Sequence, residues 1–154
     1  MVRRKSLLNS DDLDEIKNRI LSINEFSERK WGEMTAAQML RHCDRILQVG
    51  CGKIILPKTP FLVKKAGVIA KIEMKIFNNG IPRNMPTFKE VLINENCNFE
   101  KARHELLLSL NEFVKNCEKN NVVLDHVLFG RLTKYDWGFL QYKHLDHHLK
   151  QFGL

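Results

Sequence analysis

Two histidines near the C-terminal end of the chain have the spacing of a metal-binding pair. His144 and His148 lie in the segment 133–151, which also contains His147 and so holds three of the six histidines. If this segment is a helix, residues four apart point within about 40° of each other around its axis. Such a pair can bind a transition metal when another element supplies at least one further ligand.

The sequence around this pair favours a helix whose apolar face includes both histidines. Leu132 is placed as a hydrophobic staple, Thr133 as the helix cap, and Asp136 at the third helical position. His147 falls on the flank of the apolar face. That face consists of Trp137, Gln141, His144, Leu145, His148 and Phe152. The two histidines of the pair are therefore predicted to point into the protein.

A third histidine can reach the same interior from an earlier helix. Thr35 and Gln38 form a capping box, which predicts that a helix starts at this point. On the wheel of that helix, His42 falls at the edge of the buried arc. Three neutral imidazoles leave at least one metal coordination position open to water or substrate, as in catalytic zinc sites. Imidazole donors suit zinc, nickel, iron and copper.

The elements that must position these histidines are predicted to be helical. Amphipathic spacing indicates long helices over about 11–23, from Thr35 onward, over about 98–117 and over 133–151. A further basic amphipathic helix is predicted over 61–77, inside the long connection in the middle of the chain. The fold expected is all-α, with residues 1–154 forming one four-helix bundle domain and a long crossover connection that contains an extra helix.

Composition and charge exclude some partners. The basic opening residues are not followed by an apolar stretch, so the chain is expected to be cytoplasmic. No uncharged apolar run approaches the roughly 20 residues that span a bilayer, so no membrane partner is expected. The net charge of +7 comes largely from six lysines in the segment 53–75, which form either a solvated face or a surface for an acidic partner. Nucleic acid is not the expected partner.

The sequence resembles the DinB-like (DinB/YfiT-like) superfamily, and more narrowly one of its families of unknown function. The resemblance lies in the stretches 31–43 (WGEMTAAQMLRHC), 129–133 and 143–153 (KHLDHHLKQFG). It implies a four-helix bundle, often a homodimer, with a divalent metal bound by one histidine of the second helix and two of the last. By matching position, the ligands would be His42, His144 and His148. The chain departs from the family pattern where Val127, rather than proline, follows His126.

Two functional hypotheses follow. The first is a divalent-metal-dependent enzyme (zinc, nickel or iron) of unknown substrate, resembling the thiol transferases of the superfamily and acting on a small molecule such as a low-molecular-weight thiol. The ion could instead activate water for hydrolysis. The second is a non-catalytic binding or stress-response module with structural histidines and a basic surface. The residues that could orient a ligand ring or a bound water are His147, Gln141, Gln151 and His126.

Overall fold

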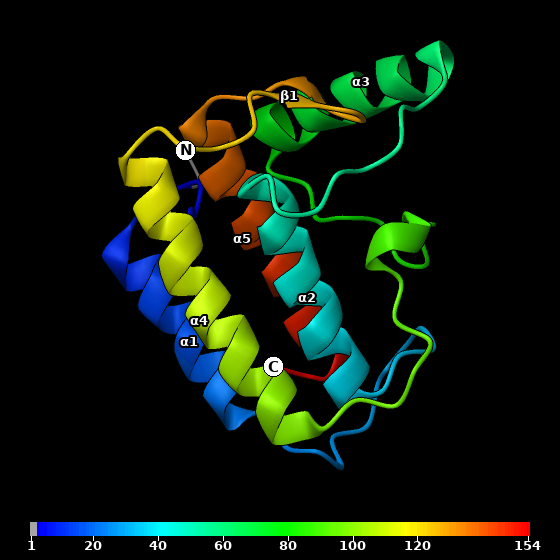
Figure 1. The fold of residues 1–154 in the computed structure, drawn as a ribbon, viewed down its shortest axis with the longest axis vertical. Coiled ribbons are helices and arrows are strands. Elements are labelled where there is room, and N and C mark those ends of the chain that lie inside the picture. The colour runs from blue at the N-terminus through cyan, green and yellow to red at the C-terminus, as the bar shows by residue number, and fades with distance from the viewer. Residues whose placement is uncertain (1–2) are drawn as a thin grey trace.

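The computed structural model describes residues 3–154 and is mostly helical, which confirms the mainly α prediction (Figure 1). A hairpin of two very short antiparallel strands was not predicted. The elements of the described residues are α1 (Ser10–Ser22), α2 (Ala36–Gly50), α3 (Phe61–Phe77), a 3-10 turn η1 (Lys89–Val91), α4 (Phe99–Glu118), β1 (Asp125–His126), β2 (Gly130–Arg131) and α5 (Lys134–Gln151).

Helices α1, α2, α4 and α5 run side by side, and α3 lies across one end of them (Figure 1). Helix α2 packs most extensively along α4, while α5 contacts α1, α2 and α4. Their buried faces form one apolar core, because the apolar side chains recur every three or four residues. Its fully buried side chains include Ile16, Ile20, Leu40, Leu47, Leu106, Leu110, Phe113 and Leu145.

The two helices that carry the clustered histidines begin with the same kind of cap. Thr35 accepts a hydrogen bond from the Gln38 backbone N–H (3.2 Å), and the Gln38 side chain accepts one from the Thr35 N–H (2.9 Å). Thr133 and Asp136 exchange the equivalent bonds, at 3.2 and 2.9 Å. Both predicted caps are confirmed. They satisfy backbone N–H groups that have no partner within the helix.

Helix α3 is the extra helix predicted in the crossover, and it rests on the β1–β2 hairpin. At Gly67 the backbones approach so closely that a Cβ atom would lie 2.4 Å from the carbonyl oxygen of Leu128. Lys71 donates hydrogen bonds from Nζ to the carbonyl oxygens of Phe129 (2.8 Å) and Arg131 (2.9 Å). These polar contacts, together with the buried side chain of Met74, hold the helix to the rest of the protein. Among residues 3–154, no helix is long and apolar enough to cross a membrane.

Replacing Thr133 with alanine should lower the stability of the protein, because the first turn of α5 loses its side-chain cap. The expected cost is about 1 kcal/mol, as for other Ser and Thr caps. For a chain of this length that lowers the melting temperature by roughly 2–4 °C, measured by circular dichroism. The matched control is Thr87→Ala, at an exposed loop position. Equal losses in the two variants would contradict a role for the cap.

Candidate metal centre

Three histidines that are far apart in the sequence meet between α2 and α5. One ring nitrogen from each of His42, His144 and His148 lies within 4.8 Å of the other two. The Nε2 atoms of His42 and His144, which are 102 residues apart in the chain, are separated by 3.1 Å. Zinc binds imidazole nitrogen at about 2.0–2.1 Å, so two such ligands of a tetrahedral ion lie roughly 3.3 Å apart. The cluster is therefore compatible with a metal site, and ion binding itself stays a prediction.

Hydrogen bonds on the outer side of two rings fix where their protons lie. His42 Nδ1 is 2.8 Å from the carbonyl oxygen of Val91, and His148 Nδ1 is 3.0 Å from Oε1 of Gln151. Both partners are acceptors, so each Nδ1 must donate its proton. Gln151 is itself oriented, because its Nε2 donates to the Trp31 carbonyl oxygen at 2.7 Å. Each Nε2 therefore keeps an unprotonated lone pair, which is the form that binds a metal.

The third ring has an outer nitrogen with a different environment. Nδ1 of His144 is buried and has no hydrogen-bond partner within residues 3–154, and the same is true of Oε1 of Gln141. Gln141 lies three residues earlier on α5, where side chains are neighbours, and its Nε2 donates to the Ile46 carbonyl oxygen (3.2 Å). When Nε2 of His144 faces an ion, its Nδ1 carries the proton. In that case Nδ1 of His144 is a hydrogen-bond donor and Oε1 of Gln141, on the same face of α5, is an acceptor that could pair with it.

Burial keeps all three rings neutral. Burial lowers the pKa of His42, lowers that of His144 well below its usual value, and lowers that of His148 to about 3. In His144 and His148, repulsion between the clustered rings lowers the pKa further. Protonated rings would each place a charge in the interior, where charge is costly. The cluster therefore presents neutral nitrogen donors at pH 7, as metal binding requires.

His147 lies beside this cluster without joining it. Its ring centroid is 5.1 Å from that of His148 and 5.8 Å from that of Trp31, edge-on in both cases. The guanidinium of Arg83 lies over the Trp31 ring, with its central carbon 4.0 Å from the ring centroid. These three side chains form an aromatic and cationic wall next to the histidine cluster. Neither Trp31 nor Arg83 was predicted at the site.

His126 belongs to the hairpin, away from the three clustered histidines. Its ring stacks on Phe129, with 5.0 Å between centroids, and meets Trp137 edge-on at 5.5 Å. Its Nδ1 accepts hydrogen bonds from the backbone N–H groups of Leu128 (3.1 Å) and Phe129 (3.2 Å). These contacts organise the turn beneath α3. They give His126 a structural role in the hairpin.

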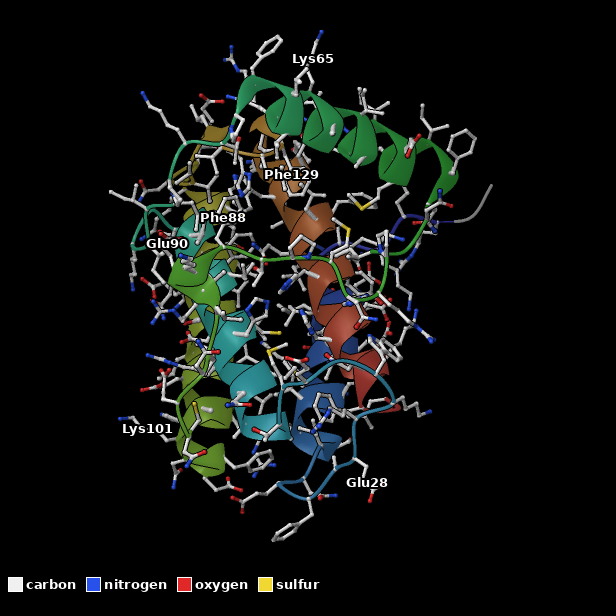
Figure 2. The ribbon with its side chains drawn as sticks, turned by 90° about the vertical axis from the view of Figure 1, so that its right-hand side faces the viewer. Glu28, Lys65, Phe88, Glu90, Lys101 and Phe129 are labelled. Carbon is white, nitrogen blue, oxygen red and sulfur yellow. The ribbon has the colours of Figure 1, made fainter. Side chains whose placement is uncertain are left out.

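The carbonyl oxygen of Val91 is a further contact that the sequence did not predict. It lies in η1, within the connection between α3 and α4 that passes beside α2, as the labelled Phe88 and Glu90 show (Figure 2). Arg45 of α2 donates from Nε to the Glu90 carbonyl oxygen at 2.8 Å, which holds this turn in place. A backbone acceptor leaves no side-chain signal in a sequence. Only the path of the connection shows that it reaches His42.

His126 should make the protein less stable in mild acid. Burial lowers its pKa to about 4 from an ordinary value of 6.5, so below pH 6.5 the unfolded chain binds more protons than the folded one. The free energy of unfolding therefore falls as the pH falls, and His126 accounts for a decrease of about 2 kcal/mol between pH 7 and pH 5. Urea unfolding with a chelator present measures it. His126→Gln should flatten the pH dependence relative to the unaltered protein; identical slopes in the two proteins would contradict this assignment.

Comparison with known proteins places the chain in a family without assigning it an activity. No curated protein and no solved structure matches it. Residues 1–153 match the family described as "Protein of unknown function (DUF1569)". Because the match covers nearly the whole length, the chain belongs to the DUF1569 family.

Proposed function

We propose that this protein is a divalent-metal-dependent enzyme whose ion is held by His42, His144 and His148. The observation that carries the proposal is the placement of ring protons: acceptors at Val91 and Gln151 hold two Nδ1 protons outward, so lone pairs converge on one point. Three imidazole ligands leave a coordination position for a substrate, which is typical of catalytic sites.

We also assign α1, α2, α4 and α5 to a four-helix bundle of the DinB-like type. The support is their mutual packing and the position of the histidines, one on the second and two on the last of these four helices. In this assignment α3 belongs to the crossover between α2 and α4, and the hairpin belongs to the connection between α4 and α5. The bundle interior is where such folds build metal sites from facing helices.

The proposed substrate is a small molecule, and a low-molecular-weight thiol fits the donor set. Within the described residues the cluster contains neutral imidazoles and no carboxylate or cysteine, so an ion there keeps its full positive charge. When bound, a divalent ion supplies Lewis acidity that favours the deprotonated form of a thiol or of water. Zinc, nickel and iron all suit these donors. The three rings contribute neutral, buried nitrogen atoms, and the hydrogen bonds to the Val91 carbonyl and to Gln151 orient two of them.

The lysines of the segment 53–75 give little support to a basic binding surface. Lys53 contacts Glu112 at 2.6 Å, and Lys64 contacts Asp125 at 3.4 Å. Lys75 contacts Asp136 at 2.6 Å, and Lys71 is bonded to hairpin carbonyls. Four of the six lysines thus have partners within the chain. We therefore favour the enzyme over the non-catalytic module.

Protein purified without chelator should contain about one divalent ion per chain, as a single three-histidine site implies. Elemental analysis measures this directly. His144→Ala and His148→Ala should lose the ion, because two ligands remain, while the matched control His147→Ala should keep it. An unaltered protein without metal, or the same metal content in all variants, would contradict the proposal.

Binding of a thiol can be tested separately from metal content. The cobalt-substituted protein should gain a sulfur-to-cobalt charge-transfer absorption when a low-molecular-weight thiol such as cysteine or dithiothreitol is added. The same thiol should leave His42→Ala, which has lost a ligand, without this absorption. A cobalt-loaded protein whose spectrum is unchanged by thiols would exclude thiol chemistry and leave hydrolysis as the activity of the site.

A further inference from the structure

The outward side of α3 exposes large apolar side chains to solvent. On a helical wheel most of them fall within an arc of about 100°. Contiguous apolar patches of this kind mark interaction sites on soluble proteins. We call this the outer face of α3. Its apolar members, each between 46% and 76% exposed, are Phe61, Leu62, Ile69, Ile72, Ile76 and Phe77.

The inner side of the helix accounts for most of its lysines. Lys71 and Lys75 point toward the hairpin and α5, where they bind carbonyl oxygens and Asp136. On the outer face the charged side chains are Lys65 and Glu73. Lys65 points away from the rest of the protein (Figure 2). The outer face therefore combines apolar groups with one charge of each sign.

Most residues of the outer face are arranged symmetrically along the helix; Ile72 is the exception, because Ala66 stands at its counterpart position. Ile69 is the central residue of α3, which spans residues 61–77. Phenylalanines stand eight residues to either side of it, Leu62 and Ile76 stand seven to either side, and Lys65 and Glu73 stand four to either side. An antiparallel pair of such helices, related by a twofold axis at Ile69, sets each residue opposite its counterpart. Aromatic then meets aromatic, aliphatic meets aliphatic, and lysine meets glutamate.

We propose that a second copy of this chain docks on the outer face of α3, forming a twofold symmetric dimer through antiparallel α3 helices. In this dimer Lys65 lies opposite the partner's Glu73, and Glu73 lies opposite the partner's Lys65. Burial of the apolar side chains supplies the affinity, and the two charge pairs set register and orientation. The position of α3 across one end of the protein leaves this face accessible to a partner (Figure 1).

Charge favours a second copy over an anionic membrane as the occupant. Helices that lie on membranes carry several lysines or arginines on the polar face, close to the lipid headgroups. In α3 those lysines are bonded to the hairpin and to Asp136, and Glu73 would face the lipid. The outer face carries no excess positive charge to attract anionic lipid. Self-association needs only the balanced pair that is present.

The test is charge reversal followed in analytical ultracentrifugation. The unaltered protein should be dimeric. Lys65→Glu and Glu73→Lys should each weaken the dimer at least about tenfold, because like charges then face each other twice. Lysine and glutamate have similar helix propensities, so neither change should unfold α3. Glu28→Lys, at an exposed position far from α3 (Figure 2), makes the same charge change as Glu73→Lys; as the control for that variant it should leave the dimer intact.

The double variant Lys65→Glu, Glu73→Lys restores both opposite-charge pairs and should recover the dimer. Recovery would support the antiparallel register, because misfolding caused by one reversal is not rescued by a second. Net charge cannot account for weakening by both single variants, since Lys65→Glu lowers it and Glu73→Lys raises it. A monomeric unaltered protein, or a dimer that both single variants leave unchanged, would overturn the proposal. Cosedimentation of a monomeric protein with phosphatidylserine vesicles would overturn it as well, and would assign the outer face to a membrane.

Discussion

The histidine cluster depends on a requirement that applies to every buried polar group: each needs a hydrogen-bond partner. Two of the three rings meet it through their outer nitrogens, one at the Val91 carbonyl and one at Gln151, whose amide is held by the Trp31 carbonyl. These bonds determine the tautomer, and the tautomer determines that lone pairs face inward. The connections 23–35 and 78–98 therefore help to orient the histidine cluster, although neither carries one of its three histidines.

The third ring shows how the same requirement can mark a function. Nδ1 of His144 and Oε1 of Gln141 are buried without hydrogen-bond partners among the described residues, in a protein whose other buried polar groups are largely satisfied. An unpaired buried group costs roughly 1–3 kcal/mol. Such costs are tolerated where a site needs a particular geometry. Here the geometry brings three neutral ring nitrogens within 4.8 Å of one another, an arrangement compatible with a metal site.

Helix α3 separates two tasks between its two sides. Its inner side uses Gly67 for close approach, lysines for polar contacts and a single large buried apolar side chain, Met74. The apolar residues that give the helix its amphipathic pattern consequently point outward. Reading the pattern as a sign of burial against the chain's own core would place them on the wrong side. The net charge of +7 is likewise less available to an acidic partner than the lysine count implies. Four of the six lysines in the segment 53–75 have partners within the chain.

Local sequence determined where the helices lie and how α2 and α5 begin. Capping residues and apolar spacing act over a few positions, so Thr35, Thr133 and the 61–77 helix could be recognised without the fold. The same periodicity assigned inward directions to His144 and His148. It could not show that His126 belongs to a hairpin, because the paired strands are two residues long and leave no periodic signal.

The tertiary structure alone decided the distances and the partners. The meeting of His42 with a pair 102 residues later depends on how α2 and α5 pack, which no local pattern specifies. The Val91 carbonyl and the Arg83–Trp31 contact come from connections whose paths depend on the whole fold. Sequence thus determined which groups could do chemistry, because side-chain type and helical period are local properties. Their protonation and convergence were decided by packing, because burial and hydrogen-bond partners are properties of the assembled chain.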